Sequence, residues 1–394
     1  MLNIKNEKIN KELFENIELL SKTEIKSALD YVVKKIDENL DLYTHNFPSA
    51  CTTNQIYRTK GNDDWTNGFW TAMIWLAYDY TGDEKYKKVA KIHSESFHKR
   101  LEEHFVLDHH DLGFLYSLST IADFKITGDT KYRDSSIWAA NKLLDRFQEN
   151  GEFIQAWGKK GDPKEYRMII DCLFNLPLLY WASEETGDSK YKDVANKHFE
   201  TATKNLIRED ASTYHTYYFD LETGEPTKGV THQGFSDDSS WARGQAWAVY
   251  GMPLNFKYNK HEKSEFIYER VLNYYLNRIP EDLVCYWDLI FTKKDNEPRD
   301  SSSAAIVACG ILEMDKYISE HENKETYMKA AHGMLRSLIQ NYTTKDMESN
   351  GVLKEGVYSY HSGKGVNECN LWGDYFYMEA LMRVYKEKDL MLYW

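Results

Sequence analysis

Apolar and amphipathic segments alternate along the chain in a repeating order. Three segments rich in apolar and aromatic residues are each followed by a Lys-rich polar segment, and they occupy residues 65–80, 111–126 and 171–186. The linker between the two has the form Thr-Gly-Asp-x-Lys-Tyr in all three copies, at residues 81–86, 127–132 and 186–191. In such a linker Gly supplies the left-handed residue that ends one helix, and Asp caps the next helix. The repeat therefore predicts a helical hairpin with one mostly apolar helix and one amphipathic helix.

Three weaker units continue this order downstream. Apolar helices are predicted at 241–258, 300–317 and 370–386, and polar helices at 261–277 and 322–342. The last apolar helix lacks a following partner, which N-terminal helices at 10–20 and 22–39 would supply. Six apolar and six amphipathic helices predict an all-α fold, a six-hairpin (α/α)6 toroid with the apolar helices inside. A bundle of unrelated helices is the alternative, and the three copies of one linker argue against it.

No Pro- or Ser-rich linker divides the chain, so we expect one domain over residues 1–394. In a closed ring all six inner helices run the same way, and their N-termini meet at one mouth. An acidic residue stands at each of these N-termini: Asp64, Asp111, Asp171, Asp238, Asp300 and Glu368. Most of these acids are expected to be N-caps. Long connections with a few short strands would open on the same face, at 151–167, 210–238 and 348–368.

Asp171 is the most informative of these acids, because it lies in an otherwise apolar run at 168–174. Burial of an ionised carboxylate there is costly, so its pKa should rise or the group should be paired. A carboxyl that stays protonated near neutral pH is what a general acid needs. An N-cap, which favours the anion, is the opposing interpretation. Asp111 holds the equivalent place one repeat earlier, so both carboxylates would face one pocket, where repulsion would raise one pKa. His110 beside it would be either a ligand contact or a polar edge residue.

Composition and charge narrow the class of function. The chain has 62 acidic and 49 basic residues and a net charge of -13, which argues against nucleic acid or a membrane as a partner. Aromatic residues make up 14% of the chain and indicate either flat faces for sugars or an aromatic core. The five cysteines form no close pairs and no zinc-ligand spacing, and no apolar run of a signal peptide or membrane span is found. We expect a cytoplasmic protein without metal or cofactor, as a monomer or weak homodimer.

Four motifs together resemble those of the unsaturated glucuronyl hydrolases of glycoside hydrolase family 88. They are Trp-Thr-Asn-Gly-Phe-Trp at 65–70, His-Asp-Leu-Gly-Phe at 110–114, Ile170-Asp171 in its apolar run, and Trp-Ala-Arg-Gly-Gln-Ala-Trp at 241–247. The motifs keep the family's order over nearly the whole chain. The resemblance implies the six-hairpin toroid and a bacterial glycosidase. Its substrate is a lyase product with a 4,5-unsaturated uronic acid at the non-reducing end.

The resemblance also implies the reaction and the residues that perform it. Such an enzyme hydrates the vinyl ether instead of displacing the group at C1, so the carboxylate spacing rules of ordinary glycosidases do not transfer. Asp171 matches the general acid/base, which donates a proton to C4 and activates the water that adds at C5. Asp111 matches the second essential carboxylate. Further ligand contacts are implied for His110, His215, Gln233, Arg243 and Trp247, with Trp65 and Trp157 as stacking platforms.

Some of these residues have a second interpretation. Core packing is the alternative for Trp65 and Trp247. Arg243 lies in an otherwise apolar helix and needs a carboxylate partner, either the substrate or a neighbouring Asp. Because the chain is acidic overall, capture of an anionic disaccharide would depend on a local basic set of Arg243, Lys364, His110 and His215.

The segment Ser-Tyr-His-Ser-Gly-Lys bears on the choice of substrate through Ser359, Ser362 and Lys364. It resembles the Ser-x-x-Ser-x-Lys pattern that family members preferring sulfated chondroitin or hyaluronan fragments use for a sulfate, and an ordinary turn is the alternative. We therefore expect a hydrolase of unsaturated glycosaminoglycan disaccharides that favours sulfated substrates. The rivals are an unsaturated rhamnogalacturonyl hydrolase acting on pectin fragments, a sugar epimerase on a similar toroid, and a catalytically silent carbohydrate-binding toroid.

Overall fold

The repeated linkers are helix boundaries in the structure, a computed structural model that describes residues 3–318, 321–387, 390, 393 and 394. Three helices end at Gly82, Gly128 and Gly187, whose φ angles are 72°, 75° and 73°. In each copy the following Asp accepts a hydrogen bond from the backbone N–H two residues later and so caps the next helix. The predicted helical hairpin is confirmed at all three linkers.

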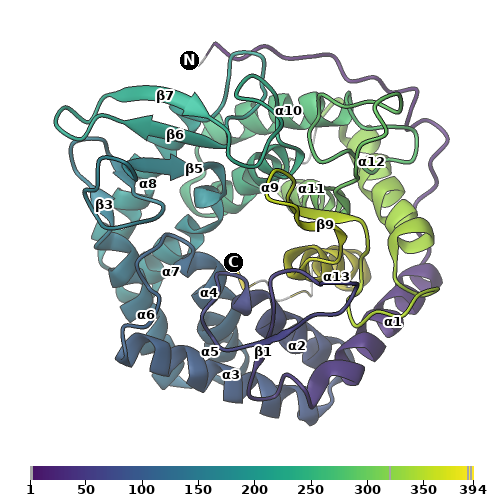
Figure 1. The fold of residues 1–394 in the computed structure, drawn as a ribbon, viewed down its shortest axis with the longest axis horizontal. Coiled ribbons are helices and arrows are strands. Elements are labelled where there is room, and N and C mark those ends of the chain that lie inside the picture. The colour runs from purple at the N-terminus through teal and green to yellow at the C-terminus, as the bar shows by residue number, and fades with distance from the viewer. Residues whose placement is uncertain (1–2, 319–320, 388–389, 391–392) are drawn as a thin grey trace.

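Six apolar helical segments lie on the inside of the molecule (Figure 1). They are α2 (Asn67–Thr81), α4 (Leu112–Tyr116) continued by η1 (Ser117–Ile121) and α5 (Ala122–Thr127), η2 (Ile170–Phe174) followed by α7 (Leu176–Thr186), α9 (Ala242–Asn259), α11 (Ser301–Met314) and α13 (Leu371–Lys386). Every residue of α11 is buried, and most residues of the other five segments are buried too. This burial on all sides explains why the segments have no polar face.

Amphipathic helices form an outer layer and bury one stripe each. They are α1 (Lys22–Leu40), α3 (Glu84–Glu102), α6 (Thr130–Leu144), α8 (Ser189–Asn205), α10 (Glu262–Leu276) and α12 (Lys324–Ser337), which continues as η3 (Leu338–Tyr342). Successive inner segments contact each other in a circuit from α2 through α4, α7, α9, α11 and α13 back to α2. The outer partner of α13 is α1, as predicted. None of the described helices is both long and apolar enough to cross a membrane.

The strands are short and lie in the connections between hairpins. Two-stranded antiparallel pairs are β1 (Phe47–Pro48) with β2 (Thr59–Lys60), β3 (Phe147–Gln148) with β4 (Phe153–Ile154), and β8 (Gly356–Ser359) with β9 (Lys364–Glu368). A three-stranded sheet contains β5 (Arg167–Ile169), β6 (Thr216–Phe219) and β7 (Pro226–Val230), with β6 in the middle. The chain is therefore mostly helical with a few short strands. Strands β4 to β9 lie in or at the end of the predicted connections, whereas β1, β2 and β3 lie in segments where no strand was predicted.

Residues 10–20 do not form the predicted helix. Residues 12–16 make turns, and the rest of the segment is neither helix nor strand. Side chains of α12 bind its backbone: the amide of Leu20 donates to His332 Nδ1 at 3.0 Å, and Arg336 donates to the carbonyl of Glu18 at 2.6 Å. Another element thus provides the hydrogen bonds that a helix would have made internally, and the segment passes outside α10 and α12 toward α1 (Figure 1).

The first turns of three inner segments approach so closely that glycine is required. A Cβ on Gly68 would lie 2.1 Å from the carbonyl oxygen of Phe114, and a Cβ on Gly113 would lie 2.4 Å from the Cα of Asn175. The backbone N–H of Phe114 also donates to Asn175 Oδ1 at 3.2 Å. The absence of a side chain at these two positions therefore draws together the N-termini of α2, α4 and the η2–α7 segment.

Gly113→Ala should lower the free energy of unfolding by about 1–3 kcal/mol, because the added methyl group meets backbone atoms that cannot turn aside. Urea denaturation followed by circular dichroism measures this change. Gly61→Ala is the matched control, since a Cβ on Gly61 has no atom within 4 Å. Its effect should stay below about 0.5 kcal/mol. Equal losses for the two variants would contradict the close packing of the helix N-termini.

Candidate active site

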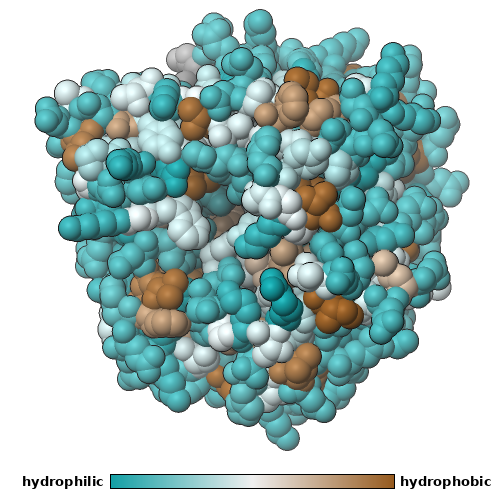
Figure 2. Space-filling model, viewed as in Figure 1, coloured by the Kyte–Doolittle hydropathy of each residue, from teal (hydrophilic) through white to brown (hydrophobic). Residues whose placement is uncertain are grey.

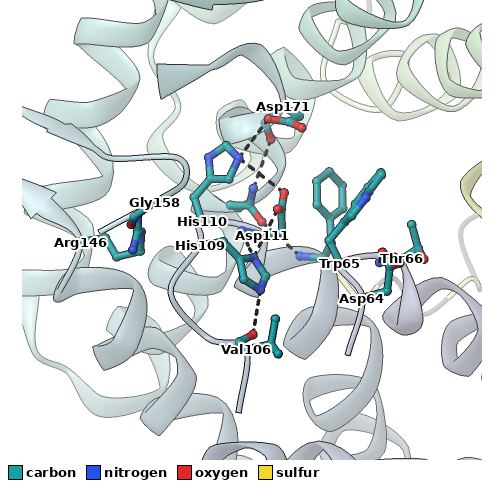
Figure 3. Close-up of polar contacts among 12 residues, drawn as sticks. Asp64, Trp65, Thr66, Val106, His109, His110, Asp111, Arg146, Gly158 and Asp171 are labelled. Carbon is teal, nitrogen blue, oxygen red and sulfur yellow. Dashed lines mark hydrogen bonds and ion pairs between the residues drawn. The ribbon is translucent and has the colours of Figure 1, made fainter. Parts of the chain in front are cut away.

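Two carboxylates and one imidazole meet where the inner helices begin (Figure 3). The Nε2 atom of His110 lies 3.3 Å from Asp171 Oδ1 and 3.5 Å from Asp111 Oδ1. The side chains of His110 and Asp111 are only 1% and 2% exposed, whereas that of Asp171 is 17% exposed. The prediction that Asp111 and Asp171 lie at one site is confirmed. Asp171 is the member of the group that solvent can reach.

The local sequence explains how these side chains are held. The amide of Asp111 donates to His109 Nδ1 at 3.2 Å, and the same nitrogen lies 3.3 Å from Asp111 Oδ2. The amide of His110 donates to the carbonyl of Ala156 at 2.8 Å. Asp171 lies in the short helix η2, directly after strand β5. Asn175 links the two segments, since it contacts Phe114 of α4 and donates to the carbonyl of Asp171 at 3.4 Å.

Burial and charge give the two carboxyl groups different acidities. Burial raises the pKa of Asp171; the positive charge of His110 opposes this rise, and the charge of Asp111 adds to it. Burial would also raise the pKa of Asp111, but the positive charges of His110 and His109 outweigh it and hold that pKa below its ordinary value. Burial would lower the pKa of His110, but the two carboxylates raise it overall. The pair thus separates into a stable anion, Asp111, and a carboxyl that keeps its proton more readily, Asp171.

Among the residues that the structure describes, His110, Asp111 and Asp171 form the one group that could hold a metal ion. One ligand atom from each of them lies within 4.8 Å of the other two. Their chemistry also fits a proton. An imidazole between two carboxylates has its charged form stabilised from both sides, and a protonated His110 neutralises one of the two negative charges. The arrangement can therefore hold and move a proton at Asp171 with no further component.

The two predicted stacking platforms differ in how they are supported. Trp157 is 37% exposed and stacks on His109 at a centroid distance of 5.4 Å. Arg146 holds its loop by donating to the carbonyls of Gln155 at 2.8 Å and Gly158 at 3.1 Å. Trp65 stacks on Trp372 and is partly buried, so packing and ligand contact are compatible for this residue.

Arg243 has a protein carboxylate as its partner. Its guanidinium donates to Asp300 Oδ2 at 2.7 Å, to Gln233 Oε1 at 2.8 Å and to the carbonyls of Val357 and Tyr358. The side chains of Arg243 and Asp300 are almost completely buried. The neighbouring Asp, not the substrate, is therefore the partner of this charge, and Arg243 orients Gln233.

His215 lies next to Gln233, with 3.5 Å between their Nε2 atoms. Burial holds the pKa of His215 well below its ordinary value, and the charges of His232 and Arg167 lower it further. His215 is therefore a neutral polar group. The basic set expected from the sequence is wrong in two of its four members, since His215 carries no charge and the charge of Arg243 is neutralised by Asp300.

Trp247 is not an open stacking surface. Its side chain is 1% exposed, and its ring packs against Phe114, Phe174 and Phe376 at 4.8 to 5.6 Å. The alternative of core packing is correct for this residue in the structure. Trp247 thus packs against Phe114 and Phe174, which lie in the helix turns that follow the two carboxylates.

The predicted sulfate motif occupies the tight hairpin between β8 and β9. Ser359 pairs with Lys364 in the antiparallel register, and Ser362 donates to the carbonyl of Ser359 at 3.3 Å. The ammonium group of Lys364 lies 3.9 Å over the ring of Tyr358, whose hydroxyl accepts a hydrogen bond from Trp65 Nε1 at 3.0 Å. The hairpin thus places its exposed Lys364 beside the platform of Trp65. The face around this mouth is mostly hydrophilic and is hollowed near its centre (Figure 2).

Sequence reasoning missed several residues that hold the site. Asp300 was recognised only as a helix N-terminal acid, and His109 was not singled out. Asn175, Arg146 and Tyr358 were also missed: Asn175 and Tyr358 contact residues 61 and 115 positions away, and Arg146 holds a loop whose course the sequence does not indicate. A search for buried polar side chains near helix N-termini could have found Asn175, and no pattern in the chain would have indicated the other two.

Comparisons with known proteins place this site in a family. The model of Glycosyl Hydrolase Family 88 matches residues 39–388. The unsaturated chondroitin disaccharide hydrolase of Streptococcus agalactiae is 50% identical over 387 residues, which are 98% of this chain and 97% of that protein. The unsaturated glucuronyl hydrolase of a Bacillus species is 42% identical over 359 residues, which are 90% of this chain and 95% of that protein.

Solved structures agree with these relatives. The crystal structure of the unsaturated glucuronyl hydrolase from Streptococcus agalactiae superposes with a TM-score of 0.97 at 50% identity, covering 99% of both chains. An aspartate-to-asparagine variant of that enzyme, complexed with dGlcA-GalNAc6S, superposes with a TM-score of 0.89 at 47% identity, again over 99% of both chains. With a family match and close relatives over nearly its whole length, the chain belongs to glycosyl hydrolase family 88.

Proposed function

We propose that the chain is an unsaturated glucuronyl hydrolase, which releases 4,5-unsaturated glucuronic acid from lyase-generated chondroitin or hyaluronan disaccharides and favours sulfated ones. The observation that carries this proposal is the partly exposed carboxyl of Asp171, whose pKa burial raises, beside the buried anion of Asp111. The names of the chondroitin-disaccharide and glucuronyl hydrolases that the chain resembles support the same substrate class.

We infer that the fold is the six-hairpin (α/α)6 toroid and that residues 1–394 form one domain. The circuit of contacts through the inner helices supports the toroid, and the family match over residues 39–388 supports a single unit. The five cysteines are free buried thiols, which supports a reducing, cytoplasmic location. The disaccharide is the proposed partner, and the proposed state is a monomer or weak homodimer that requires no metal, cofactor, nucleic acid or membrane.

In the first step the protonated Asp171 donates its proton to C4 of the unsaturated uronate. Positive charge develops at C5 and the ring oxygen, close to the carboxylate that Asp171 leaves behind. Water then adds at C5 and gives a proton to Asp171, which restores the acid. The resulting hemiketal opens to a ketone at C5, and the group at C1 leaves as the reducing-end sugar while C1 becomes an aldehyde. One water molecule is consumed, and the products are a sugar and a keto acid.

This cycle requires a carboxyl that both donates and accepts a proton, and opposing effects provide it. Burial favours the protonated form of Asp171, whereas His110 at 3.3 Å favours the anion. The pKa is thereby kept between those of a fully buried acid and an exposed one, which suits a group with both tasks. Asp111, whose own pKa is held low, favours the charged form of His110 and so raises the pKa of that imidazole.

The remaining predicted residues surround this centre, and we propose the following roles for them. Trp65 and Trp157 stack on the sugar rings. Gln233, oriented by Arg243, and the neutral His215 bind hydroxyl or carboxylate oxygens of the uronate. Lys364 supplies the exposed positive charge for a sulfate on the second sugar, with the hydroxyls of Ser359 and Ser362 beside it. Among the residues predicted to attract an anion, Lys364 is the one that is both charged and exposed.

Asp171→Asn should reduce turnover by about 10²–10⁴-fold, because an amide cannot donate the proton to C4. Loss of the ultraviolet absorbance of the unsaturated uronate measures turnover, and circular dichroism checks the fold. Asp134→Asn, at an exposed carboxylate of α6, is the control and should retain full activity. Substantial turnover by the Asp171→Asn variant would exclude Asp171 as the proton shuttle.

The pH dependence of kcat should show a decline on the alkaline side that belongs to Asp171. The acid form is the proton donor, so activity is present below the pKa of this group and is lost as the pH rises through it. Because burial raises that pKa, the decline should lie above the range of an ordinary aspartate, which is about 3.9. A pH–rate profile of the wild-type enzyme measures it, and a decline within the ordinary range would contradict the assignment.

Lys364→Ala should lower kcat/KM for a 6-sulfated chondroitin disaccharide more than for its unsulfated counterpart. A hydrogen bond to a charged group contributes about 1.5–3 kcal/mol, so the difference should be about tenfold to a hundredfold. Lys228→Ala, at an exposed lysine of β7, is the matched control and should affect both substrates equally. Equal losses of kcat/KM for Lys364→Ala on the two disaccharides would contradict a role of Lys364 in sulfate recognition. Assaying a rhamnogalacturonan lyase product beside the two chondroitin disaccharides tests the alternative of a pectin-derived substrate.

A further inference from the structure

We propose that Trp394 is a positioning residue, which closes the inner ring beneath the active site and holds the two helix turns that carry Asp111 and Asp171. This inference rests on the proposed function of those carboxylates and extends it to a part of the chain far from the mouth. The described residues beyond Glu387, which are Leu390, Tyr393 and Trp394, are all buried. Figure 1 marks the C-terminal end at the centre of the ring of helices.

The indole of Trp394 packs directly against the turns that follow both carboxylates. Its ring centroid lies 5.5 Å from Phe174 and 6.0 Å from Phe114, with interplanar angles of 85° in both cases. Phe114 is the third residue after Asp111, and Phe174 is the third residue after Asp171. The two phenyl rings also stack on each other at 5.6 Å. The indole therefore contacts both the turn after Asp111 and the turn after Asp171. The spacing of these two turns sets the distance between the carboxylates.

A directional hydrogen bond fixes the position of the indole. Its Nε1 donates to Glu379 Oε2 at 2.9 Å, and the main-chain oxygen of Trp394 accepts a hydrogen bond from Lys257 at 2.6 Å. Glu379 is buried and also accepts hydrogen bonds from Arg383, Tyr250 and Tyr375. The network thus explains why tryptophan, with a ring and a donor, is suited to this place.

The stack beneath the site also limits the hydration of Asp171. Loss of the indole would leave a cavity next to Phe114 and Phe174, into which these rings and their turns can relax. The charged groups that act on Asp171, namely His110, Asp111 and Arg243, are not altered by a substitution at Trp394. A change in the acidity of Asp171 in such a variant would therefore report altered geometry or hydration of the site.

Trp394→Ala should lower kcat at least about tenfold with KM changed less than about threefold, because misplacement of the carboxylates affects the chemical step more than binding. The alkaline decline of kcat should move to lower pH as Asp171 becomes better hydrated. Trp394→Phe keeps a ring but loses the bond to Glu379, and its effects should be intermediate. Steady-state kinetics over a range of pH on the unsulfated chondroitin disaccharide measure these changes.

Trp181→Ala is the matched control, since Trp181 is a buried tryptophan of α7 that packs against Phe124, away from both carboxylates. It should lower the thermal stability without moving the pH profile. The inference is overturned if Trp394→Ala lowers stability alone, or if Trp181→Ala changes kcat and the pH profile equally. If Trp394→Ala does not fold, Trp394→Phe, which keeps an aromatic ring, is compared with Trp394→Leu, which does not. Identical pH profiles of kcat for these two variants overturn the inference.

If the wild-type protein does not turn over the disaccharide, the proposed function fails, and this result is distinct from a failure of the role of Trp394. In that case ¹³C NMR titration of the Asp171 carboxyl in the wild type and in the Trp394 variants tests the positioning role without turnover. A lower pKa in Trp394→Ala or Trp394→Phe supports the role, and an unchanged pKa in these variants overturns it.

Discussion

The close approach of inner-helix N-termini is the constraint on which the site depends. Gly68 and Gly113 leave no room for a Cβ, and Asn175 joins the second and third of these segments with hydrogen bonds. This spacing brings His110 within 3.3 Å of Asp171 and 3.5 Å of Asp111. At such distances in a buried setting, small changes in separation change the energy of each charge strongly, so the packing of the ring and the acidity of the carboxyls cannot vary independently.

The aromatic residues serve two purposes that burial distinguishes. Most of them fill the inner ring, where Phe114, Phe174, Trp247 and Trp394 form one stack behind the carboxylates. Trp157 instead keeps an exposed face at the mouth. A rigid aromatic support behind a group of reacting side chains limits their movement and excludes water, and an exposed ring offers a flat surface to a sugar. Most of the aromatic content therefore belongs to the core, and the exposed ring of Trp157 is the surface proposed to bind a sugar.

Two buried arginines, Arg243 and Arg383, are paired with carboxylates within the protein, so their charges are not available to a ligand. Asp300 neutralises Arg243, and Glu313 and Glu379 surround Arg383. These pairs fix loops and helix ends but attract no substrate. In the proposed function, the exposed ammonium of Lys364 is left for recognition and the His110 group for the chemistry. The net charge of -13 is therefore compatible with the proposed anionic substrate, because the proposed contact is made by the local positive charge of Lys364.

The sequence by itself determined the helical hairpins and their order, and it singled out Asp111 and Asp171 among the acids at the helix N-termini. Those signals are local, since a linker Gly or Asp acts within a few residues and an acid in an apolar run is visible at once. Only the tertiary structure decided the irregular course of residues 10–20, the partner of Arg243, the neutral state of His215 and the place of Trp394. These properties depend on distances and burial between residues far apart in the chain, and through-space interactions of this kind leave no pattern in the sequence.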